Sequence, residues 1–382
     1  PVPQAFSFAR PAAPPAETRR GQPKRMPVEP VIGYPVITSA APPPTSSGLV
    51  DVEARARHLA GLGLPPGLAA RYASSADDFD LRVWIVDNSG SMQTGDGNRI
   101  VRKADGTFAN VRSSRWDELG ESLLFHGNMA VGLGAATQFC VLNPPGGGIP
   151  QTIWCGTGAP ATEMDLIRRL RESSPTGRTP LCAAIRSATQ TILDRAPQLR
   201  ATGKRCVLVI ASDGAATDGD VAAALRPLLD LPVSVVVRLC TDEEAVCEYW
   251  NRTDDDIELA LDVLDDVVGE AGEIKAHSPW LTYSEPLHRL REWGCAEKLL
   301  DLLDERSLSL AEMRRLVSFL FGDASADLPD PQLDWAAFES ALATLLGKEP
   351  QIYDPLRGRM RPMIDVDKLR RAYRGGGGCT LQ

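Results

Sequence analysis

Short apolar runs that alternate with helix-like segments restrict the fold of this chain more than any other feature of its sequence. Residues 81–86, 205–210 and 233–239 are largely apolar stretches of strand length, which is typical of strands buried on both faces. Helical signals lie between them, among them the capping-box-like sequence Ser114-x-x-Asp117. Strands that alternate with helices form a parallel sheet covered by helices on both faces. We therefore expect a Rossmann-like, doubly wound α/β fold with a mostly parallel sheet.

The same kinds of signal place the remaining elements. Asp105-Gly106 lies in the middle of a partly alternating stretch and predicts a hairpin over residues 99–111. Helices are expected over residues 51–72 with a break near Pro65-Pro66, and over 116–133, 180–193, 220–229, 257–268 and 334–345, with further helix starts at Thr241 and Ser309 and a short strand over 139–142.

Composition divides the chain into five parts. Residues 1–50 are rich in Pro, Ala, Ser and Thr and bury too little apolar surface to order themselves, so we expect a disordered tail. Residues 51–78 are interpreted as a helical lead-in to an α/β domain over 79–275. Residues 276–347 predict a small helical extension, and the loss of periodicity over 348–382 indicates a flexible basic tail.

Charge and cysteine usage exclude several classes of function. The formal net charge of −9 argues against nucleic acid as a partner, because phosphate binding needs a basic footprint. The eight cysteines form no C-x-x-C pair and the four histidines no ligand spacing, so a zinc site is not expected. No signal-peptide pattern opens the sequence and no apolar run is long enough to span a bilayer, which predicts a cytoplasmic or nuclear location.

A tight loop after the first expected strand carries an oxygen-rich motif. Asp87, Ser89 and Ser91 occupy alternate positions, and Gly90 allows a sharp bend between them. A hard cation such as Mg²⁺ takes oxygen ligands in near-octahedral geometry, so these side chains can converge on one ion. An EF-hand is excluded because the twelfth position counted from Asp87 is Asn98 rather than Glu.

Two further loops supply matching oxygens. Thr179 stands just before a helix, and Asp213 follows the expected strand over residues 205–210. Ligand sites in open α/β sheets lie beyond the carboxyl ends of the strands, where these loops are expected to meet. Two carboxylates balance a dication formally, and neutral hydroxyls leave the ion electrophilic toward an incoming carboxylate.

The sequence resembles the von Willebrand factor A (VWA) family, intracellular type, over about residues 79–275. In order and residue type, five positions resemble the metal-ion-dependent adhesion site of that family: Asp87, Ser89, Ser91, Thr179 and Asp213. The resemblance implies that the three hydroxyls coordinate Mg²⁺ (or Mn²⁺ or Ca²⁺) directly, and that the two carboxylates ligate it or act through bound waters. It also implies an open coordination position for an Asp or Glu of a protein partner. The expected function is therefore a metal-dependent protein-protein interaction module and not an enzyme.

Three other interpretations remain open. The carboxylates could cap helices while the serines close turns, without any metal. The chain could be a metal-dependent hydrolase or phosphoryl-transfer enzyme, although no general base, Walker loop or G-x-S-x-G elbow accompanies the motif. It could also be a scaffold subunit of the same fold that needs no metal.

The sequence departs from the family pattern in two places. The hairpin over residues 99–111 is inserted where a short connection is usual, and it either shapes the choice of partner or decorates the surface. Ser212 stands where Thr is common, which keeps a hydroxyl at that position.

The chain ends in Cys379-Thr380-Leu381-Gln382, which resembles a prenylation box for a farnesyl group. Seven basic residues lie upstream and would supply the second signal that stable membrane binding needs: Arg357, Arg359, Arg361, Lys368, Arg370, Arg371 and Arg374. Cys379 is therefore a lipidation candidate, and the alternative is an accidental match on a flexible end. Prenylation would add peripheral membrane association to the cytoplasmic location.

Overall fold

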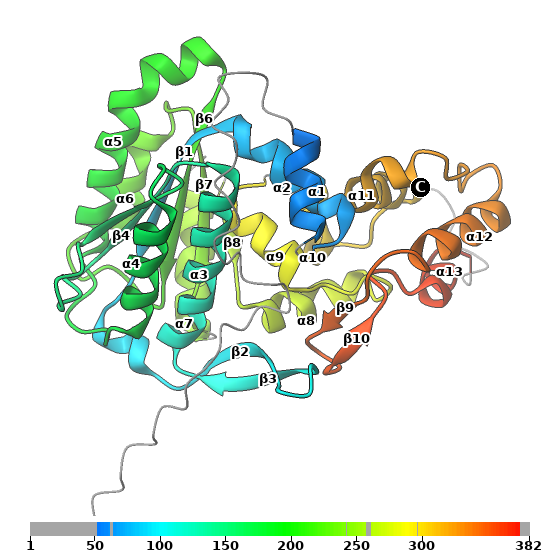
Figure 1. Ribbon diagram of the computed structural model, residues 1–382, viewed down its shortest axis with the longest axis horizontal. Coiled ribbons are helices and arrows are strands. Elements are labelled where there is room, and N and C mark those ends of the chain that lie inside the picture. The colour runs from blue at the N-terminus through cyan, green and yellow to red at the C-terminus, as the bar shows by residue number, and fades with distance from the viewer. Residues whose placement is uncertain (1–51, 62–63, 242, 257–260, 296, 375–382) are drawn as a thin grey trace, which may run out of the picture. The chain divides into compact units, whose positions relative to one another are not determined.

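The computed structural model describes residues 52–61, 64–241, 243–256, 261–295 and 297–374. These residues contain a six-stranded sheet in the order β5-β4-β1-β6-β7-β8, which lies in the left half of Figure 1. Neighbouring strands pair in parallel, except that β5 runs antiparallel to β4. The strands are β1 (Phe79–Val86), β4 (Thr137–Val141), β5 (Thr152–Cys155), β6 (Arg205–Ser212), β7 (Val233–Leu239) and β8 (Leu261–Leu264). The expected α/β fold with a mostly parallel sheet is confirmed.

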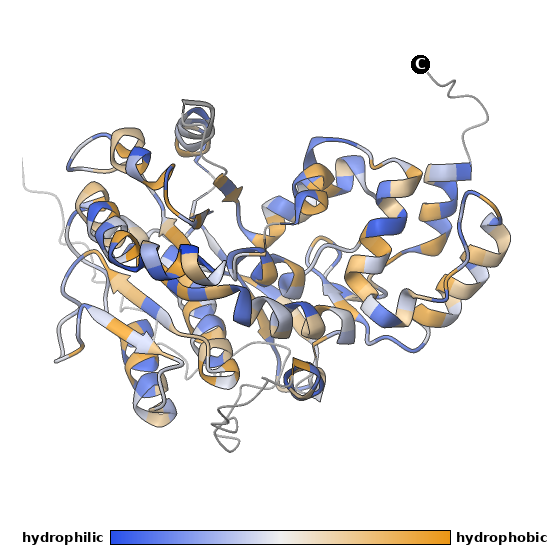
Figure 2. Ribbon diagram, turned by 90° about the horizontal axis from the view of Figure 1, so that it is seen from above, coloured by the Kyte–Doolittle hydropathy of each residue, from blue (hydrophilic) through white to orange (hydrophobic). Residues whose placement is uncertain are grey.

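Alternating side chains of β1 enter two apolar cores, one on each face of the sheet. Leu81, Val83 and Ile85 are buried in one core, whereas Trp84 and Val86 are buried in the other. The first core is covered by α5 (Leu181–Thr202), α6 (Val221–Leu225) and α7 (Glu244–Asp256), and the second by α3 (Arg115–Leu133) and α4 (Pro160–Glu172). Figure 2 shows apolar residues, in orange, interspersed with hydrophilic residues, in blue, along the helices.

Segments outside the expected α/β domain complete the second core. Arg82 on β1 donates from Nη2 to the carbonyl of Ser75 at 2.8 Å and from Nε to that of Trp293 at 3.1 Å. Ser75 belongs to α2 (Pro66–Asp78), and Trp293 ends α9 (Glu285–Glu292). Residues 66–78 of the expected lead-in are helical, and the region after residue 275 shares the core of the sheet.

One expected helix is wrong in part. Residues 257–268 were predicted to be helical, but Leu261–Leu264 forms β8 and pairs in parallel with β7. Asp266 then caps a new helix, α8 (Val267–His277), by accepting from the N–H groups of its first turn. A short apolar run does not distinguish strand from helix by periodicity alone, and pairing with β7 decides the outcome here. Residues 257–260 lie outside the described ranges.

The helical extension forms largely as expected. The Ser309 side chain and Glu312 make a reciprocal capping box at the start of a helix. The elements are α10 (Lys298–Glu305), α11 (Leu310–Phe321) and α12 (Trp335–Leu346), in addition to the lead-in helix α1 (Val52–Gly61).

The prediction of a flexible tail from residue 348 onward is wrong for residues 352–374. This stretch forms a hairpin and a helix, β9 (Ile352–Asp354), β10 (Arg359–Arg361) and α13 (Val366–Arg374), and buries Met363, Ile364 and Leu369. Strands of three residues show no readable alternation, so long-range burial rather than local periodicity orders them. Residues 375–382, with Cys379, lie outside the described ranges, as does the predicted tail at 1–50.

The inserted hairpin is confirmed as β2 (Gly97–Arg102) and β3 (Phe108–Ser113). Gly106 closes its turn with a φ of 83°, a conformation that favours glycine. At the far end the ring of Phe108 lies 5.7 Å from that of Tyr353 on β9. The hairpin therefore joins the loop after β1 to the carboxyl-terminal region (Figure 1).

Candidate metal centre

Asp87 lies at the carboxyl end of β1 and is fully buried. Its Oδ1 accepts from the backbone N–H of Ser89 at 2.8 Å, and its Oδ2 accepts from the hydroxyl of Ser212 at 2.6 Å. Burial raises the pKa of Asp87, and these hydrogen bonds oppose that rise. A cation beside the carboxylate would favour the ionised form in the same way.

Ser91 links the first loop to the third. Its hydroxyl donates to Asp213 Oδ1 at 2.8 Å, and its Oγ lies 3.0 Å from Oγ of Ser89. Asp213 follows β6, the neighbour of β1, and the backbone N–H of Asp87 donates to the carbonyl of Ala211 at 2.9 Å. Four of the five predicted ligands thus lie together at the carboxyl edge of two adjacent strands.

The loop that carries Thr179 is tied to both of the others through the backbone. Gly90 N–H donates to the carbonyl of Gly177 at 3.1 Å, and Thr217 N–H donates to the carbonyl of Thr179 at 2.9 Å. Thr179 is buried, and no described residue makes a hydrogen bond to its hydroxyl. The fold therefore brings the second loop to the same edge, with a hydroxyl that the protein does not use elsewhere among the described residues.

Arg115 is a member of this site that sequence reasoning missed. Its Nη1 donates to Asp213 Oδ2 at 3.0 Å, Nε and Nη2 hold both oxygens of Asp96 at 2.7 and 2.6 Å, and Nη2 also donates to Glu243 at 2.7 Å. The side chain is buried. A signal was present, because a positive charge directly after the Ser114 cap opposes the helix dipole and needs compensation.

The charges of the site suit a divalent cation. Asp87, Asp213, Asp96 and Glu243 carry four negative charges against the single positive charge of Arg115, a formal balance of 1 − 4 = −3. A dication reduces this excess without needing a proton. Serine and threonine hydroxyls and aspartate oxygens are the donors that Mg²⁺ and similar hard ions prefer.

A second acidic group, not predicted from the sequence, lies on α8 and α10. One oxygen each from Glu270, Glu273 and Asp304 lie within 4.8 Å of one another. Burial raises the pKa of Glu270 to about 7, while Arg291 donates to its carboxylate at 2.6 Å. The Arg291 guanidinium already supplies the positive charge here, so this group is a weaker candidate for a metal than the loops at the sheet edge.

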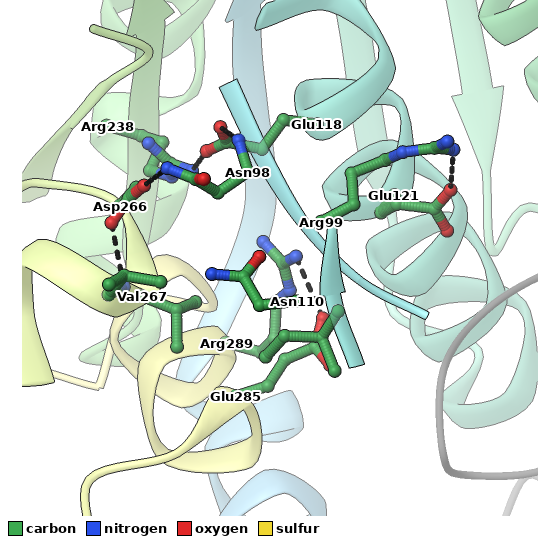
Figure 3. Close-up of a pocket in the computed structure, with 12 residues that line it drawn as sticks. Asn98, Arg99, Asn110, Glu118, Glu121, Arg238, Asp266, Val267, Glu285 and Arg289 are labelled. Atoms are coloured by element: carbon green, nitrogen blue, oxygen red, sulfur yellow. Dashed lines mark hydrogen bonds and ion pairs between the residues drawn. The ribbon is translucent and has the colours of Figure 1, made fainter. Parts of the chain in front are cut away.

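A small cavity lies between the inserted hairpin and the helices beneath it (Figure 3). Its volume is about 20 Å³, which has room for about one water molecule. Asn98 crosses it, donating from its backbone to Glu118 and from its side chain to Asp266, both at 2.8 Å. A buried ion pair between Arg238 and Glu118 forms one wall. The cavity is too small for an organic substrate.

Comparisons with known proteins add no family. No protein-family model matches the chain, and no curated protein matches it. The VWA resemblance therefore stays a prediction that rests on the residues of the site. Within the part of the chain that the structure describes, none of the helices has the length and apolarity that a membrane crossing needs.

Proposed function

We propose that this chain is a VWA-like, metal-dependent protein-interaction module, which holds Mg²⁺ (or Mn²⁺ or Ca²⁺) and binds an Asp or Glu of a partner protein. The contact that carries the proposal is the hydrogen bond from Ser91 to Asp213, because it joins two predicted ligands that are 122 residues apart. The backbone bonds that bring the Thr179 loop to the same edge support it further.

The composition of the ligand set favours binding over catalysis. In the proposed arrangement Ser89, Ser91 and Thr179 coordinate through neutral hydroxyls, so the cation keeps its attraction for an external carboxylate. Ser91 and Gly90 are exposed, which leaves this side of the loop open to a partner. The charge of Arg115 offsets part of the negative field that would otherwise repel an acidic group.

The direct test is a calorimetric titration of the chain with Mg²⁺ and Mn²⁺. Asp87→Ala and Thr179→Ala should abolish or strongly weaken binding while the fold, followed by circular dichroism, persists. Asp165→Ala is the matched control, because Asp165 is an exposed carboxylate on α4. No heat of binding to the wild-type chain would favour a metal-independent scaffold.

Partner capture tests the second half of the proposal. A protein retained from lysate in Mg²⁺ should be released by EDTA and should not bind the Asp87→Ala variant. Capture that is unchanged in EDTA would contradict the role of the cation. Turnover of a phosphoester that depends on Asp87 would instead support the hydrolase alternative.

We further propose that the protein is cytoplasmic and touches a membrane surface through a farnesyl group on Cys379. Arg370, Arg371 and Arg374 of α13 are exposed shortly before that residue, where basic side chains would add attraction to anionic lipid. Mass spectrometry of the protein from eukaryotic cells should show the lipid on Cys379, and Cys379→Ser should lack it. An unmodified, full-length terminus would contradict this proposal.

A further inference from the structure

Arg115 connects the candidate metal centre to the inserted hairpin. Its guanidinium contacts three carboxylates from three separate segments: Asp96, just before β2; Asp213, just after β6; and Glu243, just before α7. Asp96 is held by two parallel hydrogen bonds, a geometry that fixes its orientation as well as its distance. A displacement of Arg115 would therefore also displace Asp96 and the start of the hairpin.

The base of the hairpin is seated closely on its neighbours. A Cβ at Gly97 would lie 2.7 Å from the carbonyl oxygen of Ser114, so the two backbones are in direct contact. One residue further on, Asn98 bonds both Glu118 of α3 and Asp266 at the start of α8 (Figure 3). These contacts restrict movement of β2 relative to the first turn of α3, where Arg115 lies.

The oxygens of Asp213 are shared between two elements. Ser91 of the metal loop bonds Oδ1, and Arg115 bonds Oδ2. Arg115 and a metal cation bound to Asp213 are both positively charged. Each therefore lowers the affinity of the Asp213 carboxylate for the other. Such coupling is reciprocal: if Arg115 weakens cation binding, cation binding weakens the hold of Arg115 on Asp213.

We propose that Arg115 is a positioning residue that couples cation occupancy at Asp213 to the conformation of the β2–β3 hairpin, and so lets the hairpin respond to metal binding. This inference rests on the proposed metal centre. The hairpin also contacts the carboxyl-terminal region through Phe108 and Tyr353, so the response can extend to β9.

The test measures affinity and hairpin mobility on the full chain, with Mn²⁺ as the probe. Calorimetry gives the dissociation constant, and hydrogen exchange of residues 97–113 gives the hairpin response. In the wild type, saturating Mn²⁺ should speed exchange in the hairpin by about threefold or more. In Arg115→Gln, Mn²⁺ should bind about tenfold more tightly, and the change in exchange should be lost. A purely structural role would weaken binding, not tighten it.

Two further variants separate the contributions. Arg99→Gln is the matched control, because Arg99 also joins the hairpin to α3, at 3.3 Å from Glu121, without contacting Asp213. It should keep wild-type affinity and the wild-type response to Mn²⁺. Asp96→Asn leaves the Arg115–Asp213 pair in place but weakens the link to the hairpin. Its dissociation constant for Mn²⁺ should stay within about threefold of the wild-type value, and the change in hairpin exchange should be lost. This variant provides the test if Arg115→Gln does not fold.

The outcomes distinguish this inference from the proposed function. Mn²⁺ binding to the wild type without any change in hairpin exchange would overturn the coupling and leave the metal centre standing. An Arg115→Gln or Asp96→Asn variant that keeps the full response would overturn it as well. No Mn²⁺ binding to the wild type would overturn the metal centre, and the coupling with it.

Discussion

The hydroxyl of Ser212 donates to Oδ2 of Asp87 at 2.6 Å, from the last residue of β6 to the first residue after β1. This bond fixes the orientation of the proposed ligand from the neighbouring strand. It leaves Oδ1 to the metal loop itself, where Ser89 N–H binds it.

Ser212→Ala should therefore weaken Mn²⁺ binding by about 10–100-fold, because a ligand that loses its supporting hydrogen bond loses its orientation. Ser212→Thr keeps the hydroxyl and should stay close to wild type. Calorimetry on the three proteins measures the difference. Equal affinities for all three would mean that Ser212 does not orient Asp87.

Gly177 permits a second, steric test of the site. Gly177 lies in the loop that carries Thr179 and has a φ of +96°. A Cβ added to it would lie 2.6 Å from the side chain of Asn143. Gly177→Ala should destabilise the fold by about 1–3 kcal/mol and weaken Mn²⁺ binding. Gly146→Ala is the control, because Gly146 has a φ of +76° with no atom within 4 Å of an added Cβ. It should show strain alone, with Mn²⁺ affinity unchanged.

A buried charge network lies behind the site, around Glu292. This carboxylate is fully buried and accepts from His126 Nε2 at 2.8 Å, from Arg238 Nε at 3.0 Å and from Arg289 Nη1 at 2.9 Å. Although burial opposes it, Arg289 and the flanking histidines hold the pKa of Glu292 well below its usual range.

Glu292→Gln should destabilise the protein by about 3–5 kcal/mol, because it removes the counter-charge that buried Arg238 and Arg289 share and leaves them only Glu118 and Glu285. Urea denaturation followed by circular dichroism measures the change. Glu305→Gln is the control, since Glu305 is exposed on α10 and should cost less than about 0.5 kcal/mol. A loss below about 1 kcal/mol for Glu292→Gln would show that the network contributes little to stability.

His288 in the same network predicts a pH dependence of stability. Burial lowers its pKa to about 4 from the ordinary 6.5, so between these values the unfolded chain binds the proton and the folded chain does not. The contribution is complete above pH 6.5 and is lost as pH falls toward 4, by at most about 1.4 kcal/mol per pH unit.

The difference between wild type and His288→Gln isolates this contribution from the other titrating groups. The variant should lose less stability than wild type when urea denaturation is repeated from pH 6.5 down to pH 4.5. His58→Gln, at an exposed position on α1, should follow the wild-type profile. Parallel profiles for wild type and His288→Gln would contradict the prediction.

Local chemistry explains which parts of the fold were predictable. β1, β6 and β7 are apolar because both their faces are covered, and the loops after β1 and β6 carry four of the five predicted ligands at one sheet edge. β8 was missed because its four residues at the sheet edge alternate too briefly to differ from a helix. Arg115 was missed because its role depends on Asp96, Asp213 and Glu243, which meet only in the folded chain.

The contacts of the Arg82 guanidinium define the shortest fragment of the chain that we expect to fold stably. A chain cut at the sequence-based boundaries, residues 79–275, would lose both carbonyl acceptors of this arginine and the indole of Trp293, whose ring centre lies 3.8 Å from it. The buried guanidinium of Arg82 would then lack hydrogen-bond acceptors unless water entered the core or the surrounding residues unfolded. A stable fragment must begin before Ser75 and continue past Trp293, so the surrounding helices belong to the folding unit and are not appendages to it.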